Sequence, residues 1–215
     1  MDDEYKIAYD KAFNHGQYDF QGWSDIISVS LGAYHTVGLK KDGRVLAIGS
    51  NEKGECDVNG WSDIVSIDAL GARTAAIKSD GSVVSVGIER ESQKDLENWT
   101  DIIEVKSGGL YTVGLKSNGD VVAVGTNEHG LCNVSTWKNI IEIAAGSGVT
   151  IGLQSDGRLV MTGDERKDLD DIYSWENIVA IYLYGSSLIG VKSDGSLVAT
   201  GECGSKMDLS EFNML

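Results

Sequence analysis

Short runs of β-branched and apolar residues alternate along the chain with polar turns that contain glycine. This alternation predicts β-strands joined by tight turns. An Asp-Gly pair, Asp42-Gly43, lies between two of the runs, and Asp-Gly in that setting favours a β-hairpin. Within residues 23–60 the pattern predicts four strands, over Ile26–Leu31, Tyr34–Lys40, Val45–Ile48 and Cys56–Val58. Strands of this length fill the segment and leave no room for a helix.

The same pattern returns with a fixed period of 38 residues. Each copy opens with Trp, then Asp or Asn two residues later, then two β-branched residues; the tryptophans are Trp23, Trp61, Trp99, Trp137 and Trp175. The hairpin glycines keep the same spacing, at Gly43, Gly81, Gly119, Gly157 and Gly195. Residues whose numbers differ by a multiple of 38 therefore share a repeat position. A fixed period of this length indicates a repeat architecture.

The repeated unit predicts an all-β fold, a β-propeller of four-stranded antiparallel blades. The prediction comprises five full 38-residue repeats and an incomplete sixth, within a single domain over 1–215. The repeats are 23–60, 61–98, 99–136, 137–174 and 175–211, with a partial blade over 1–22 and the start of a sixth repeat at 212–215. A β-solenoid is the competing architecture, but its coils are usually shorter and would not need an Asp-Gly hairpin in every copy.

The incomplete sixth blade leaves a gap that something is expected to fill. A repeat array with an uncapped apolar face tends to associate. We therefore expect either that the two ends of the chain meet or that a second copy fills the gap.

Charge narrows the class of partner. With 18 Lys and Arg against 33 Asp and Glu, the formal net charge is −15, which counts against binding to the nucleic-acid backbone. It suits a partner protein with a basic surface. The chain lacks an apolar run approaching about 18 residues, so no membrane span is expected. The acidic start, Met1-Asp2-Asp3-Glu4, favours the cytoplasm over secretion.

Candidate chemistry is sparse. The cysteines (Cys56, Cys132, Cys203) form no C-x-x-C motif and the histidines (His15, His35, His129) are isolated, so we expect no metal and no cofactor. Glu104 and Glu142 share a repeat position and could form a carboxylate pair for acid–base catalysis. Because no nucleophile or metal cluster accompanies them, an enzyme is the least favoured reading, and we expect no catalytic residues.

Comparing the repeats with one another separates two faces. The Trp and Asp-Gly positions barely vary, as expected of a scaffold, and we expect each Trp to pack at the joint between neighbouring blades. The turns between strands one and two and between strands three and four vary, and function usually resides in loops on a rigid scaffold. The candidate binding residues on this variable face are Tyr34, His35, Glu52, Lys53, Arg73, Arg90, Leu110, Tyr111, His129 and Arg166.

Two segments carry a family resemblance. Residues 31–43 and 121–132 are similar to "A-G-x-x-H-T-x-A-L-x-x-D-G" and "V-x-x-W-G-x-N-x-x-G-Q", the motifs of the regulator-of-chromosome-condensation repeat family. The resemblance implies a propeller, typically of seven blades. The repeats here are short, like those of bacterial members and of the propeller-type β-lactamase inhibitor. They lack an insertion resembling the wedge of the eukaryotic exchange factor, so exchange activity does not carry over.

The sequence thus favours a non-enzymatic scaffold that presents variable loops to a partner protein. The alternative, implied by resemblance alone, is guanine-nucleotide exchange or another form of regulation of a small GTPase.

Overall fold

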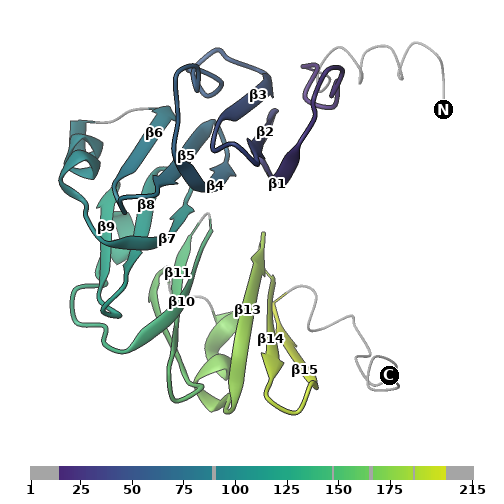
Figure 1. Cartoon of the computed structure of the whole chain (residues 1–215). Helices are drawn as coiled ribbons and strands as arrows, with labels where there is room; N and C mark the ends of the chain where they lie inside the picture. The colour runs from purple at the N-terminus through teal and green to yellow at the C-terminus, as the bar shows by residue number, and fades with distance from the viewer. Residues whose placement is uncertain (1–14, 89–90, 147, 165–166, 186, 202–215) are drawn as a thin grey trace, which may run out of the picture. The chain divides into compact units, whose positions relative to one another are not determined.

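The computed structural model describes residues 15–88, 91–146, 148–164, 167–185 and 187–201. Within them, fifteen strands form five three-stranded sheets, each made of strands consecutive in the sequence (Figure 1). The all-β prediction is confirmed. The chain divides into two compact units between Gly109 and Leu110. The strands are β1 (Ile26–Leu31), β2 (His35–Lys40), β3 (Val45–Gly49), β4 (Ile64–Leu70), β5 (Arg73–Lys78), β6 (Val83–Gly87), β7 (Ile102–Ser107), β8 (Tyr111–Lys116), β9 (Val121–Gly125), β10 (Ile140–Ala145), β11 (Val149–Gln154), β12 (Leu159–Gly163), β13 (Ile178–Tyr184), β14 (Ser187–Lys192) and β15 (Leu197–Thr200).

The predicted fourth strand is not found in the described residues. Cys56 lies in a turn and residues 57–58 are irregular, and later repeats have 3-10 helices in this part of the repeat, η1 (Glu91–Asn98), η2 (Glu128–Gly130) and η3 (Lys167–Ser174). The physical reason is local hydrogen bonding. Asn51 accepts the Cys56 N–H at 2.7 Å and donates to Asp57 Oδ1 at 2.8 Å. Asn127 repeats this arrangement with Cys132 and Asn133. Side chains of this type compete with strand pairing for the backbone groups.

The Asp-Gly hairpins have three-residue loops, one residue longer than the tightest hairpin turn. Lys40 pairs with Arg44, and Gly43 alone takes a left-handed conformation, with φ of 79°, as in a turn closed by a glycine bulge. Asp42 Oδ1 accepts the Arg44 N–H at 3.1 Å. The Asp or Asn of every other hairpin accepts the N–H two residues on in the same way, at Asp80, Asn118, Asp156 and Asp194.

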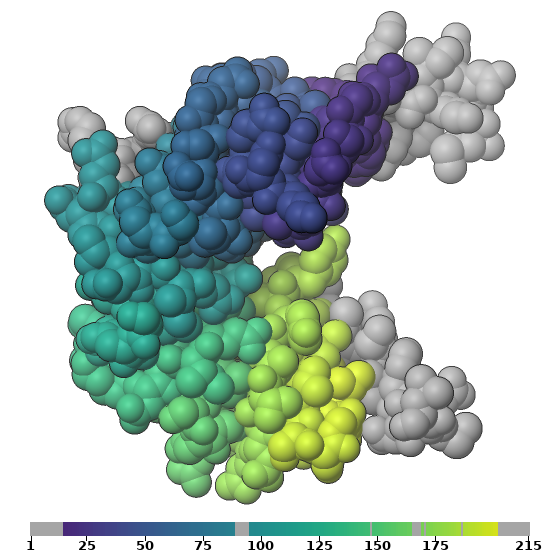
Figure 2. Space-filling view, viewed as in Figure 1, coloured from purple at the N-terminus to yellow at the C-terminus, as the bar shows by residue number. Residues whose placement is uncertain are grey.

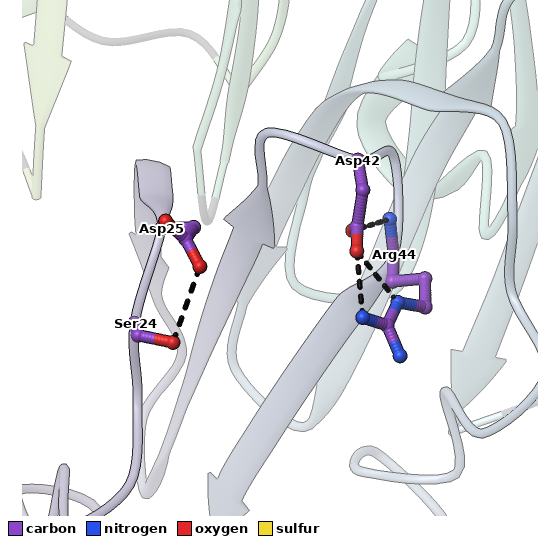
Figure 3. A network of polar contacts seen from close by, with 4 residues as sticks. All are labelled: Ser24, Asp25, Asp42 and Arg44. Carbon is purple, nitrogen blue, oxygen red and sulfur yellow. Dashed lines mark hydrogen bonds and ion pairs between the residues drawn. The ribbon is translucent and has the colours of Figure 1, made fainter.

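The Asx residue after each Trp also has a left-handed backbone, with φ between 58° and 61° at Asp25, Asp63, Asp101, Asn139 and Asn177. Asp and Asn tolerate this conformation better than most residues with a side chain. The carbonyl of Asp63 accepts the Ser79 N–H at 2.8 Å, which ties the start of β4 to the end of β5. Figure 3 shows Asp25, whose carboxylate accepts the Ser24 hydroxyl at 3.3 Å, with the Asp42–Arg44 ion pair of the following hairpin nearby.

The hairpins of the first four sheets each join their sheet to the next one. The N–H of Ile64, the first residue of β4, donates to the carbonyl of Gly43 at 3.0 Å. The bond recurs from Ile102 to Gly81, from Ile140 to Gly119 and from Ile178 to Gly157. We call this contact, with the Asx residue that precedes its donor, the hairpin joint.

Apolar side chains fill the space behind the hairpin joints. Val37, Leu39 and Val45 of the first sheet form one buried cluster with Ile64 and Ala69 of the second. Ile151 and Leu159 of the fourth sheet pack likewise with Ile178 and Ile181 of the fifth. Stability in this architecture therefore comes from repeated contacts between neighbouring sheets.

A β-bulge sits in the first strand of the first, second, fourth and fifth sheets. In β1 the pairing shifts between Ile26 and Ser28, which leaves Ile27 as an extra residue. The bulge turns an aliphatic side chain to solvent, and the residues at this repeat position are 52–63% exposed in all five copies: Ile27, Val65, Ile103, Ile141 and Val179.

We predict that Gly157→Ala destabilises the protein more than Gly195→Ala does. Both glycines have a positive φ and follow an Asp, so alanine strains the backbone by about 1–2 kcal/mol at either site. A Cβ at Gly157 would also lie 3.0 Å from Asn177 Cα, whereas Gly195 has open space around it. The free energy of unfolding in urea should fall by about 1 kcal/mol more for Gly157→Ala. Equal losses would show that close packing at the hairpin joint contributes nothing to the free energy of unfolding.

Candidate functional site

The two variable turns of a sheet lie together, as the sequence predicts. The Ser50 N–H, just after β3, donates to the Tyr34 carbonyl, just before β2, at 2.8 Å. The bond recurs in three further sheets, from Ile88 to Ala72, from Thr126 to Leu110 and from Asp164 to Gly148. Main-chain bonds of this kind hold the loops in place whatever side chains they carry.

Several candidate binding residues lie at the surface of this face. The Tyr34 side chain is 42% exposed, and its ring centroid lies 5.0 Å from that of His15. Glu52 and Lys53 are exposed in the neighbouring loop. The Lys53 N–H donates to the carboxylate of buried Glu55 at 2.7 Å, which fixes the loop. The first unit thus presents an aromatic ring and charged side chains on an ordered loop.

The second unit contributes His129 and Leu110. His129 Nδ1 lies 3.1 Å from Asp164 Oδ1, and both side chains are largely exposed. His129 has a φ of 58°, in the left-handed region that few residues other than glycine adopt. Leu110 is half-buried. Arg90 and Arg166 lie outside the described residues.

His35, Arg73 and Tyr111 are buried, which corrects their assignment to the surface. Each is 1% exposed and begins the second strand of its sheet. His35 Nε2 lies 2.9 Å from Thr74 Oγ1 in the next sheet, and Arg73 Nη2 donates to the Ile88 carbonyl. The variation at this repeat position is variation in interior packing. Sequence alone did not reveal this, because a polar residue beside a turn looks like a surface residue.

Tyr111 links its repeat to the next one through its hydroxyl group. Its hydroxyl lies 2.7 Å from the Val149 carbonyl and 3.1 Å from that of Gly146, both in the fourth repeat. Burial raises the pKa of Tyr111 to about 12. The phenol therefore stays protonated at physiological pH and works as a buried donor between repeats.

A threonine, which the sequence reasoning overlooked, recurs at one position of the first four repeats. At Thr36, Thr74 and Thr150 its hydroxyl binds a main-chain carbonyl 19 residues earlier. Thr36 Oγ1 donates to the Gln17 carbonyl at 2.7 Å, Thr74 to Glu55 at 2.7 Å and Thr150 to Leu131 at 2.8 Å. The signal was present, since Thr36, Thr74, Thr112 and Thr150 share one repeat position inside apolar strands. A hydroxyl there needs a buried partner.

The tryptophans lie against glycines of the second strand. A Cβ at Gly38 would approach the Trp23 ring to 2.4 Å, and Gly152 and Gly190 bear the same relation to Trp137 and Trp175 at 2.9 Å. Trp175 also belongs to a buried cluster that includes Ile151 of the preceding sheet. Trp99, Trp137 and Trp175 are buried, whereas Trp23 and Trp61 are half-buried, so the later indoles offer little surface to a partner.

Acidic side chains of the first strands bind backbone groups. Asp68 Oδ2 accepts the Ser107 N–H at 2.6 Å, while burial raises the pKa of this carboxyl group. Glu142 accepts the Ile181 N–H at 3.2 Å, and Glu104 lies 3.3 Å from the Lys106 ammonium. These contacts give each of the three carboxylates a structural partner. Among the described residues, no group of three or more His, Cys, Asp or Glu side chains is placed to hold a metal ion.

One family model and several solved structures are similar to this chain. Residues 26–55 match the model of the regulator of chromosome condensation (RCC1) repeat. No curated protein is detectably similar in sequence. Among solved structures, human WBSCR16 aligns with a TM-score of 0.65 at 14% identity, over 82% of this chain and 61% of that one.

Yeast RCC1 (Prp20), solved with Kap60 bound, aligns with a TM-score of 0.63 at 18% identity, over 82% of this chain and 56% of that one. The ectodomain of the Arabidopsis thaliana receptor kinase ACR4 aligns with a TM-score of 0.64 at 17% identity, over 82% and 65%. The chain spans less than two thirds of the length of each.

The similar structures and the succession of small sheets define a protein of the β-propeller class. The family resemblance inferred from the sequence is confirmed by residues 26–55, which carry the regulator-of-chromosome-condensation repeat. No helix among the described residues has the length and apolar character needed to cross a membrane.

We predict that His35 makes the protein less stable as the pH falls from 7 to 5. Burial disfavours the imidazolium, so the pKa of His35 lies below its ordinary value of 6.5, although Glu55 partly opposes the shift. The unfolded chain therefore takes up this proton first, and stability decreases below pH 6.5. His35→Gln should flatten the dependence of the free energy of unfolding on pH. A slope equal to that of the wild type would contradict this role.

We also predict that Tyr111→Phe lowers the free energy of unfolding by about 1–2 kcal/mol, because the buried carbonyls of Gly146 and Val149 lose a donor. Tyr34→Phe, at an exposed ring, is the matched control and should leave the unfolding midpoint in urea unchanged. An unaltered midpoint for Tyr111→Phe would mean that water replaces the phenol.

Proposed function

We propose that the chain is a non-enzymatic scaffold that binds a partner protein through the variable face. The observation that carries this proposal is the contrast between the constant turns at one end of each sheet and the variable turns at the other. On one side, hairpin joints repeat with almost unchanged residues. On the other, main-chain bonds hold loops whose exposed side chains differ from sheet to sheet. A fixed framework with variable loops is the arrangement that binding proteins commonly use.

The partner surface is centred on Tyr34 and Lys53 of the first sheet. A partly exposed tyrosine beside a charged loop has the composition of an interaction hot spot, where a few residues supply most of the binding energy. The net charge of −15 favours a partner with a basic surface through long-range attraction. Binding should therefore weaken as salt is added.

We predict that Tyr34→Ala/Lys53→Ala weakens partner binding by about tenfold or more, since truncation at a hot spot costs about 2 kcal/mol. The measurement is affinity capture from the native lysate, followed by titration of the captured protein. Lys41→Ala/Val65→Ala is the control, because these exposed residues lie on the hairpin side and at the bulge. If both variants capture the same proteins equally well, the variable face is not the binding surface.

The same capture separates the alternative function. A captured GTPase that releases its nucleotide faster in the presence of the wild-type chain would favour regulation of a small GTPase. A partner without that response would favour the scaffold.

A further inference from the structure

The first sheet presents an apolar face without a cover. Val29 is 52% exposed, yet the residues at its repeat position in the third, fourth and fifth sheets, Val105, Ile143 and Ile181, are only 1–3% exposed. Leu31 is 59% exposed, whereas Ala69 at the same repeat position is 6% exposed. We call the surface formed by Val29 and Leu31 the leading face.

The internal sheets show what normally covers this face. Ile181 packs in one cluster with Ile151, Leu153 and Leu159 of the preceding sheet. In the first unit, Ala69 packs with Val37, Leu39 and Val45 of the sheet before it. No sheet precedes β1 within the described residues, so Val29 and Leu31 lack the apolar partners that their counterparts have.

The fifth sheet presents the surface that would fit. Ile189, Val191 and Leu197 are half-buried, whereas their counterparts in the fourth sheet, Ile151, Leu153 and Leu159, are 0–4% exposed. Tyr182, 62% exposed, stands at the repeat position from which Ser30 and Asp68 bind the backbone of the following sheet. We call the surface formed by Tyr182, Ile189, Val191 and Leu197 the trailing face.

The hairpin joint is likewise open on the trailing side. A Cβ at Gly43, Gly81, Gly119 or Gly157 would lie 3.0–3.4 Å from the Asx residue or first strand of the next sheet, but nothing lies within 4 Å of one at Gly195. Asp25, with its left-handed backbone, holds the matching position at the start of β1. The fifth sheet thus carries the glycine half of a hairpin joint, and the first sheet carries the Asx half. Residues of the first sheet, in purple, and of the fifth, in yellow, both reach the surface in Figure 2.

We propose that the trailing face of one copy packs on the leading face of a second copy, in the geometry of an internal joint. Every copy carries one of each face: Val29, Leu31 and Tyr182 are exposed, and the three aliphatic residues of the trailing face are only half-buried. A second copy therefore supplies the matching residue types at the matching repeat positions. A repeat whose outer face stays in solvent needs that face to be polar, and the leading face is apolar.

The contact is head to tail, because the two faces differ. Such heterologous contacts close into a ring or continue into a longer assembly, unlike a symmetric two-fold patch. The association rests on the sheet faces and is independent of the variable loops proposed above to bind a partner.

Light scattering across a range of concentrations tests the proposal. The wild-type chain should show a mass of at least twice 23.0 kDa, rising with concentration. Val29→Asp and Val191→Asp each place a carboxylate in the joint, which should weaken association by about tenfold or more. Val65→Asp makes the same change at an exposed bulge residue and should associate like the wild type.

Mixing the two variants gives the sharpest result. Val29→Asp keeps its trailing face and Val191→Asp keeps its leading face, so an equimolar mixture should form a 1:1 complex although neither associates alone. Circular dichroism checks that each variant is folded, and Val191→Thr, which preserves shape, replaces Val191→Asp if that variant unfolds. The proposal is overturned by a wild-type monomer at every concentration, by an equal effect of Val65→Asp, or by a mixture that stays monomeric. A monomer destabilised by Val29→Asp would instead indicate that another part of the same chain covers the leading face.

Discussion

The hairpin joint is the contact on which the rest of the structure depends. Its donor is the first residue of a strand and its acceptor is a glycine carbonyl one sheet earlier. Both partners need unusual backbone: a glycine at positive φ in the hairpin and an Asp or Asn at positive φ after the Trp. These requirements explain why the two motifs recur together with so little change. Once the backbone halves of the joint are in place, the apolar side chains behind them meet at the same positions in each pair of neighbouring sheets described above.

The strands could be predicted from the sequence because tight turns bound each apolar run. β1 has the predicted bounds, and β2 and β3 differ from the predicted bounds by one residue. The fourth strand could not be predicted correctly, because Asn51 and Asn127 use their side chains to satisfy the backbone that a strand would have offered to its neighbour. A short run such as Cys56-Asp57-Val58 has strand-like composition, and composition does not report that competition.

The candidate site was predictable in outline and less so in detail. Strand alternation places the two variable turns on one side, and the Tyr34–Ser50 bond confirms that grouping. Comparison of the repeats could not distinguish exposed from buried variation. His35 and Tyr111 differ in side chain, yet each contacts the buried threonine 39 residues later, through an imidazole nitrogen and a phenol oxygen respectively. Variation between repeats thus has two physical sources, and burial separates them.

The recurrence of one joint has a consequence for how such a chain can change in length. Neighbouring repeats make contact through the same repeat positions: a glycine carbonyl, an Asx turn and a patch of aliphatic side chains. Duplication or loss of a whole 38-residue segment would bring the same backbone atoms of the joint opposite one another again. No single repeat therefore fixes the number of repeats, and evolution can alter that number while keeping the hairpin joint.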